Sequence, residues 1–241
     1  MKPILEVKNL MKTFTMHILN GKQIPALKNV SFSVNEGEIV GLIGKSGSGK
    51  STLMKCIYRT YLANSGQISF HSKDHGVIDL AKAADHEVLY LRKNEITYCS
   101  QFLHVIPRVS AIDVVASGAV SHGATWEEAR KKAKKLLKLL GLPRELWDAF
   151  PATFSGGEQQ RINIARAVIA APRFLVIDEP TASLDPKTKD VVIDLVLELK
   201  AKGTAVLCIS HDQHTLDRMC DRLVALKHGE IIEKELIAEE S

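Results

Sequence analysis

The sequence has few of the features that mark membrane, disordered or nucleic-acid-binding chains. Aromatic residues make up only 5% of its 241 residues, and the formal net charge of +4 is mild. No apolar run approaches the ~20 residues of a membrane-spanning helix, and the opening MKPILEVKNL lacks the apolar core of a signal peptide. We therefore expect a cytoplasmic protein with no direct membrane insertion, whose only route to a membrane is a partner.

Cysteine is also scarce, and the four cysteines Cys56, Cys99, Cys208 and Cys220 form no C-x-x-C pair. Scattered cysteines in apolar segments are typical of core positions in a reducing compartment, which argues against disulfides or a zinc site. The basic run 130–138 alternates with apolar residues at helical spacing and contains no aromatic residue. This pattern favours a solvated helix face, so we expect no nucleic-acid partner.

What is present is the composition of a folded α/β protein, with 45% apolar and 25% charged residues. Short apolar runs separated by helical spacing predict a mostly parallel sheet, whereas alternating apolar and polar residues at 30–34 predict a half-buried strand. The predicted buried strands are 39–43, 96–99, 174–177 and 205–209. Residues 125–140 predict a capped helix and 223–232 a hairpin. We predict one domain over 1–241, with a helical subdomain at about 101–160.

A glycine-rich segment follows the predicted strand at 39–43. Residues 44–51 read GKSGSGKS and match G-x-x-x-x-G-K-[ST] in full, between a buried strand and a helix pattern. Glycines let backbone N–H groups face phosphate, Lys50 supplies a point charge, and the Ser51 hydroxyl can hold Mg²⁺. The alternative, a chance glycine-rich turn, is disfavoured by this context. The predicted nucleotide-binding residues are Gly44, Ser46, Gly47, Ser48, Gly49, Lys50, Ser51 and Thr52.

Two adjacent carboxylates, Asp178 and Glu179, end the predicted buried strand at 174–177. Because parallel strands end at one edge of a sheet, we expect both beside the phosphate loop. Asp178 is predicted to hold Mg²⁺, and Glu179 to activate the attacking water as a general base. An acidic pair after a strand is by itself more often a helix cap or a turn, but the complete phosphate loop upstream favours the metal site.

A third segment carries a resemblance to a known family. Residues 154–161 read FSGGEQQR, which resembles the ABC signature LSGGQ although its first and fifth positions differ. Ser155, Gly156 and Gly157, followed by Glu158, place a hydroxyl and bare backbone amides at a helix start, where they can meet a γ-phosphate. An ordinary helix cap explains the serine but not both glycines. The ordered motifs resemble an ABC nucleotide-binding domain.

The resemblance implies a P-loop NTPase with an α/β fold: a mostly parallel core sheet, an N-terminal antiparallel β subdomain and a helical subdomain. It implies that Gln101 senses Mg²⁺ and the nucleophilic water, and that His211 holds the γ-phosphate and Glu179 in register. It further implies that Asp185 supports the dimer interface and that Phe14 stacks on adenine. The implied cofactors are ATP and Mg²⁺. Since the signature of one cassette completes the site of another, a second cassette, the same chain or a related one, is the implied partner.

Further details resemble one branch of the family. Tyr61-Leu62 and the segment SQFLHVIPRVS at 100–110 are similar to the PhnL-type ATP-binding subunit of the bacterial carbon-phosphorus lyase system. That resemblance implies an ATPase coupled to the soluble lyase core in phosphonate breakdown. The alternative is the ATPase subunit of a membrane transporter of the lipoprotein-release or efflux type, whose cassettes share SGGEQQR.

The apolar residues after Gln101 are the predicted docking surface for the partner, because an exposed apolar patch rimmed by charge usually marks an interaction site. The alternative is that they pack the helical subdomain. The surface consists of Phe102, Leu103, Val105 and Ile106 with Arg108.

Overall fold

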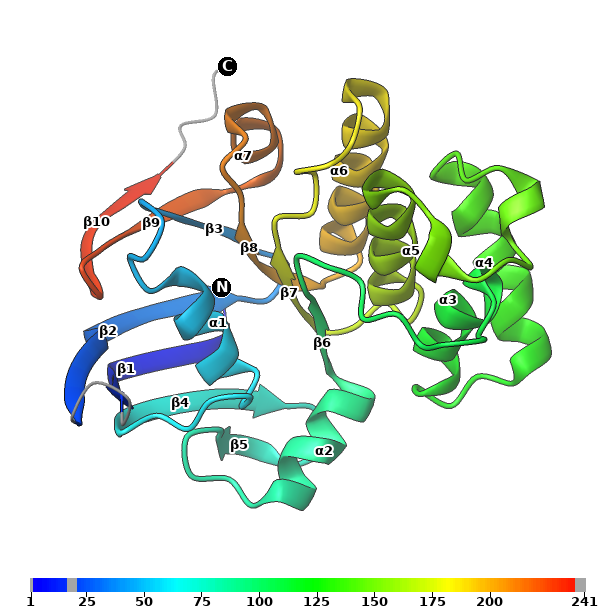
Figure 1. The fold of residues 1–241 in the computed structure, drawn as a ribbon. Helices are drawn as coiled ribbons and strands as arrows, with labels where there is room; N and C mark the ends of the chain where they lie inside the picture. The colour runs from blue at the N-terminus through cyan, green and yellow to red at the C-terminus, as the bar shows by residue number, and fades with distance from the viewer. Residues whose placement is uncertain (1, 17–20, 237–241) are drawn as a thin grey trace.

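The computed structural model describes residues 2–16 and 21–236 and contains two β-sheets (Figure 1). The first sheet has the strand order β2-β1-β4-β5, and every neighbouring pair in it is antiparallel. Its strands are β1 (Pro3–Met16), β2 (Lys22–Asn35), β4 (Ser65–Ser72) and β5 (Gly76–Asp79). This sheet is the predicted N-terminal antiparallel subdomain.

The second sheet has the order β10-β9-β3-β8-β7-β6 and is parallel except for its β9–β10 hairpin. All four predicted buried strands and the C-terminal hairpin lie in it. Its strands are β3 (Ile39–Ile43), β6 (Ile96–Cys99), β7 (Phe174–Asp178), β8 (Ala205–Ile209), β9 (Arg222–Lys227) and β10 (Glu230–Leu236). The carboxyl ends of β3, β6, β7 and β8 therefore meet at one edge of the sheet.

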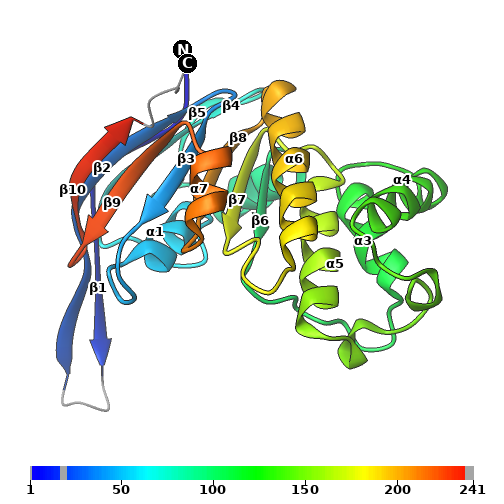
Figure 2. The same ribbon diagram turned by 90° about the horizontal axis from the view of Figure 1, so that it is seen from above.

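Seven α-helices and two 3₁₀ turns complete the described part of the chain. The predicted helical subdomain contains α3, α4 and the start of α5, which lie on the side of the molecule away from β1 and β2 (Figure 2). No helix among the described residues is long and apolar enough to cross a membrane. The helices are α1 (Lys50–Ile57), α2 (Asp85–Asn94), α3 (Ala111–Val120), α4 (Trp126–Leu139), α5 (Gly156–Val168), α6 (Pro186–Ala201) and α7 (Gln213–Met219), and the 3₁₀ turns are η2 (Arg144–Leu146) and η3 (Pro151–Thr153).

The helix α4 shows how local sequence sets the element boundaries. Thr125 precedes it as the N-cap: its hydroxyl oxygen accepts from the Glu128 N–H at 3.3 Å, while the Glu128 carboxylate accepts from the Thr125 N–H at 3.2 Å. This reciprocal pair satisfies backbone donors that a helix start leaves free. Ala129, Ala133 and Leu137 then form the buried face, as their spacing predicts.

The core consists of two apolar clusters on opposite faces of the second sheet. Along β7, Phe174 and Val176 pack into the cluster shared with the antiparallel sheet, whereas Leu175 and Ile177 pack into the helical cluster. Each fully buried side chain of this size contributes about 1.5–3 kcal/mol. Burial on both faces fixes the position at which the strand ends, and Asp178 and Glu179 follow from that fixed point.

The four cysteines are buried and free, as predicted for a reduced core. Burial raises the pKa of the Cys99 thiol to about 12 and that of Cys56 to about 11. Since the thiolate is the reactive form, these cysteines act as small apolar side chains.

Candidate active site

The phosphate loop between β3 and α1 is a backbone cradle. Gly44 and Gly49 adopt φ values of 144° and 109°. A Cβ on Gly44 would lie 2.2 Å from the Leu226 carbonyl oxygen, and a Cβ on Gly49 would lie 2.6 Å from the Ala26 carbonyl oxygen. Only glycine fits such close approaches. No side chain caps the first turn of α1, so its N–H groups remain available for phosphate oxygens.

Lys50 is buried at the base of the loop. Its ammonium donates to the carbonyl oxygens of Gly44 at 2.6 Å and Lys45 at 3.2 Å. Burial lowers the pKa of Lys50, and the charges of Glu179 and Asp178 oppose that shift. The ammonium therefore stands between the loop that would hold phosphate and the carboxylates that end β7.

Asp178 ends β7 beside the start of α1. The Tyr98 hydroxyl donates to its Oδ2 at 3.4 Å, and the Ser51 hydroxyl is a second hydrogen-bonding neighbour. Burial raises the pKa of the Asp178 carboxyl, while Tyr98, Lys55 and Ser51 oppose the shift. Mg²⁺ at nucleotide sites is held by one or two protein oxygens together with phosphates and water. Ser51 and Asp178 supply such a pair.

The described residues contain no group of three or more His, Cys, Asp or Glu side chains that could hold a metal. The hydroxyl of Ser48, in the same loop, is a buried polar atom without a hydrogen-bond partner among the described residues. It fits a phosphate oxygen.

Glu179 follows Asp178 with φ at 52°, a left-handed backbone conformation that costs about 1–3 kcal/mol for a non-glycine residue. Its N–H donates to the Ile209 carbonyl oxygen at 2.9 Å, which ties this turn to the end of β8. The sheet therefore holds Glu179 in this strained backbone conformation.

The Glu179 carboxyl is mostly buried and faces His211. The His211 N–H lies 3.4 Å from Oε2, and His211 Nε2 lies 3.4 Å from Oε1. The second contact is too long for a good hydrogen bond, and Oε1 accepts none from the described residues. Burial raises the pKa of Glu179, and the nearby His211 opposes that shift. A carboxylate with a free oxygen and a raised pKa suits a general base.

Gln101 follows β6 and lines a cavity of about 940 Å³ together with Ser51 and Asp178. Phe14 lies instead on β1, where its ring meets Tyr61 edge to face at 5.3 Å and the Lys12 ammonium lies 4.9 Å from its centroid. The sequence predicts that Phe14 stacks on adenine. The structure shows only the contacts with Tyr61 and Lys12, so stacking on the base stays a prediction.

The signature segment caps α5 on an exposed surface. Ser155 accepts from the Glu158 N–H at 3.4 Å, and Glu158 Oε2 accepts from the Ser155 N–H at 2.8 Å. A Cβ on Gly156 would meet nothing within 4 Å, whereas one on Gly157 would lie 2.9 Å from the Ser183 carbonyl oxygen. Asp185 caps α6 just beyond that contact, with Oδ1 accepting from the Thr188 N–H at 3.1 Å.

Sequence reasoning missed three positioning residues. Gln160 donates to the carbonyl oxygens of Glu179 and Pro180, both at 3.2 Å, and Asn163 donates to the Ser100 carbonyl oxygen at 2.6 Å. Helix α5, which begins with the signature, thus braces both the Glu179 turn and the segment before Gln101. Tyr98 is the third, through Asp178. The only sequence signal for Gln160 and Asn163 was that each places a side-chain amide on the apolar face of a predicted helix.

A glycine-rich phosphate-type loop, a candidate metal-binding pair and a candidate general base at one sheet edge are the features expected of a P-loop ATPase. A family model described as "ABC transporter" matches residues 27–182. The chain belongs to this family, which confirms the fold expected from the sequence and identifies it as an ATPase with ATP and Mg²⁺ as cofactors.

Among curated relatives, the chain is 33% identical over 240 residues to "Methionine import ATP-binding protein MetN 1" of Bacillus cereus, covering 98% of this chain and 66% of that protein. It is also 33% identical over 232 residues to the MetN protein of Histophilus somni, covering 96% of this chain and 64% of that one. The chain thus spans slightly less than two thirds of these relatives. Neither bears a carbon-phosphorus lyase name, so the expected PhnL-type branch gains no support from them.

Two solved structures are similar over nearly the whole chain. "Dimeric Structure of MJ0796, a Bacterial ABC Transporter Cassette" gives a TM-score of 0.88 at 32% identity, covering 97% of this chain and 99% of that one. A post-hydrolysis dimer of the same cassette bound to ADP and Pi gives 0.87 at 31% identity, with the same coverage of both chains. These dimers support a second cassette as partner.

Proposed function

We propose that this chain is the energy-coupling subunit of a membrane transporter and works as one of a pair of cassettes. The observation that carries its catalytic part is the buried Oε1 of Glu179, which has no hydrogen-bond partner in the described part of the chain and lies at the sheet edge that also presents Lys50 and Asp178. Bound Mg²⁺ supplies charge neutralisation to the phosphates. The residues then divide the work: the loop and Lys50 bind phosphate, Ser51 and Asp178 hold the metal, and Glu179 accepts the proton of the attacking water.

Two residues complete the catalytic group. The His211 backbone N–H donates to the Glu179 carboxyl, and the His211 imidazole is mostly exposed, so it can reach a γ-phosphate. Gln101 extends from β6 into the cavity that Ser51 and Asp178 line, in position to report the state of the metal site. These residues would hold the water and Glu179 in reacting geometry.

The signature acts on another cassette in this proposal. Residues Ser155 and Gly156 are exposed, and neither lines the cavity beside Ser51. A helix start with an open glycine can accept the terminal phosphate of a nucleotide bound to the facing cassette. The relatives of known structure described above are dimers.

Gly156→Ala tests the pairing because the added methyl meets nothing within 4 Å in the single chain. We expect thermal unfolding unchanged within ~0.5 kcal/mol, as for a harmless surface change. ATPase activity should fall at least about tenfold, since the methyl enters the gap where the partner's phosphate would lie. Ala152→Gly, on the exposed turn before the signature, is the control. Full activity of Gly156→Ala would exclude the facing-cassette role.

The relatives favour a membrane transporter subunit as the coupled partner, since they are named as import proteins. The predicted docking surface fits only in part: Leu103 is buried and Val105 packs on the helical core, whereas Phe102 is 73% exposed and Ile106 45%. The docking proposal therefore narrows to Phe102, Ile106 and Arg108.

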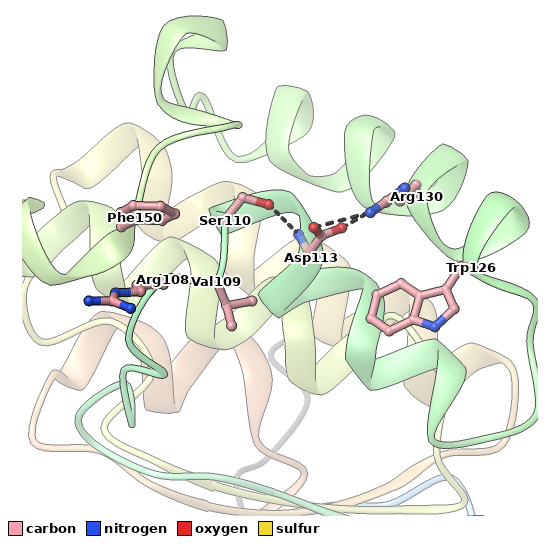
Figure 3. Close-up of a pocket in the computed structure, with 7 residues that line it drawn as sticks. All are labelled: Arg108, Val109, Ser110, Asp113, Trp126, Arg130 and Phe150. Carbon is pink, nitrogen blue, oxygen red and sulfur yellow. Dashed lines mark hydrogen bonds and ion pairs between the residues drawn. The ribbon is translucent and has the colours of Figure 1, made fainter.

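Arg108 borders a shallow cavity of about 480 Å³ next to these residues (Figure 3). In this cavity the Arg130 guanidinium donates to the two Asp113 carboxylate oxygens at 2.7 and 3.2 Å. Arg108, in contrast, has no ion pair among the described residues. The exposed rings of Trp126 and Phe150 also line it. A guanidinium that has no ion pair among the described residues and lies beside the Phe150 ring (Figure 3) suits an acidic and apolar segment of a partner.

The second candidate function, coupling to the soluble carbon-phosphorus lyase core, rests only on sequence resemblances such as those of Tyr61-Leu62 and residues 100–110. Affinity capture of the full chain from membranes and from the soluble fraction separates the two. We expect an integral membrane subunit in the wild-type capture and its loss with Phe102→Asp, while Leu139→Asp, at a position on α4 that is 52% exposed, retains it. Capture of lyase subunits without any membrane protein would reverse the order of the two functions.

A further inference from the structure

Two consecutive side-chain hydrogen bonds connect the turn that carries Glu179 to the residue beside His211. Thr181, two residues after Glu179, is buried, and its hydroxyl lies 3.0 Å from the hydroxyl of Thr215, which is buried on α7. The Thr215 hydroxyl donates to Asp212 Oδ2 at 2.6 Å, and Asp212 directly follows His211. We call these three side chains the threonine link. It joins two segments that each contribute a residue to the candidate active site.

The charge of Asp212 fixes the direction of both hydrogen bonds. The Thr215 hydroxyl and the Lys189 ammonium, which lies 3.1 Å from Oδ1, hold the pKa of the Asp212 carboxyl below its usual range, although burial opposes them. Because a carboxylate only accepts, Thr215 donates its single hydroxyl proton to Asp212. Thr181 must then donate to Thr215. Removing the Thr215 hydroxyl would leave the buried Thr181 hydroxyl without its acceptor, which is unfavourable.

Lys189 extends these contacts to the first turn of α6. That helix begins shortly after the turn at 181–184, in which the Leu184 N–H donates to the Thr181 carbonyl oxygen at 3.2 Å. Asp212 accepts from Lys189 through one carboxylate oxygen and from Thr215 through the other. Both ends of the turn at 181–184 are therefore connected to the same carboxylate.

An ordinary helix cap explains only part of this arrangement. Asp212 is the N-cap of α7 and accepts from the Thr215 N–H at 3.3 Å, as aspartates commonly do at helix starts. That backbone contact needs no hydroxyl at position 215 and involves no residue outside 212–215. The buried contact between Thr181 and Thr215 spans 34 residues and lies outside the cap, so it points to a separate role.

The turn that contains Thr181 needs to be held from several sides. Glu179 has a left-handed φ of 52°, and such strained residues persist only where the surrounding structure over-determines them. The Ile209 carbonyl oxygen holds the Glu179 N–H, and Gln160 donates to two carbonyl oxygens of the turn. The threonine link is a third attachment, and it adds a side-chain connection to α7.

We propose that Thr181 and Thr215 are positioning residues for ATP hydrolysis. Their link to Asp212 keeps the Glu179 carboxyl and the His211 backbone in a fixed relative position. The proposal rests on the proposed role of Glu179 as the general base, and neither threonine contacts the nucleotide. Proton transfer requires the base within hydrogen-bonding distance of the water, so a small displacement of Glu179 lowers the rate. Nucleotide binding depends on the phosphate loop and is unaffected.

Thr215→Val tests the link because valine keeps the branched shape of threonine and removes the hydroxyl. We expect kcat for ATP to fall about tenfold, while KM changes by less than about threefold. Thr215→Ser restores the hydroxyl and should keep kcat within about threefold of the parent value. Each variant is assayed below its unfolding transition, which thermal melting defines.

Thr204→Val is the matched control. Thr204 is also buried, and its hydroxyl donates to the Pro172 carbonyl oxygen at 2.7 Å just before β8 begins, at the end of the sheet away from the site. This variant loses a buried hydroxyl hydrogen bond without disturbing the Glu179 turn. Its kcat should therefore equal that of the parent, since sites that are far apart act independently.

Glu179→Gln separates a failure of this proposal from a failure of the base assignment. Adding Thr215→Val to Glu179→Gln should slow turnover no further, because the base that Thr215 positions is already absent. A parental kcat for Thr215→Val, an equal loss in Thr215→Ser or Thr204→Val, or fully multiplicative losses in the double variant would each overturn the proposal while Glu179→Gln remains slow. If Glu179→Gln itself hydrolyses ATP like the parent, the base assignment fails and the positioning role fails with it.

Discussion

Glu179→Gln should bind Mg-ATP and yet turn it over about 10² to 10⁴ times more slowly than the parent. Glutamine keeps the shape and the backbone contacts of Glu179, including the N–H that donates to the Ile209 carbonyl at 2.9 Å. It cannot accept a proton from water, so only the chemical step is lost. Steady-state ATPase assays and equilibrium ATP binding, measured on the same preparation, separate the two effects.

The trapped nucleotide should also hold two cassettes together. We expect an ATP-dependent dimer of Glu179→Gln by size-exclusion chromatography with light scattering, because hydrolysis no longer releases the nucleotide between them. Glu198→Gln, at an exposed position on α6, removes one carboxylate elsewhere and should behave as the parent. Undiminished turnover by Glu179→Gln would assign the base to another residue, and a variant that stays monomeric with saturating ATP would contradict self-pairing.

The sequence predicts which of these residues meet at one sheet edge, because the signals for their strands and loops are local. The glycine loop, the buried strand at 174–177 and the cap at Thr125 each depend on a few adjacent residues whose conformational preferences agree with the fold. Once parallel strands are predicted, their ends must meet at one edge. That rule brings Lys50, Asp178 and His211 together without any knowledge of long-range contacts.

The features that the sequence does not reveal depend on contacts between distant segments. Gln160 meets Glu179 across 19 residues, and Tyr98 meets Asp178 across 80. No local pattern marks such pairs. The docking prediction is wrong at Leu103 for the same reason. The sequence does not distinguish a buried apolar loop residue from an exposed one, and the Leu103 side chain is only 7% exposed.

Lys50→Ala should weaken ATP binding by about two orders of magnitude or more, because it removes a buried positive charge from the base of the phosphate cradle. The change also affects stability, because Lys50 is buried and donates to the carbonyls of Gly44 and Lys45 at 2.6 and 3.2 Å. Losing both contacts should cost about 1–3 kcal/mol of stability.

Calorimetric ATP titration of Lys50→Ala must therefore be done below its unfolding transition, which thermal melting defines. Lys45→Ala is the matched control, because it removes the same charge from the same loop at an exposed position. We expect it to bind ATP within a fewfold of the parent, since an exposed charge is screened by water and salt. A folded Lys50→Ala that binds ATP like the parent would show that the phosphate-loop assignment is wrong. If both variants lost the same ATP affinity, Lys50 would contribute only a general electrostatic attraction between the loop and an anion.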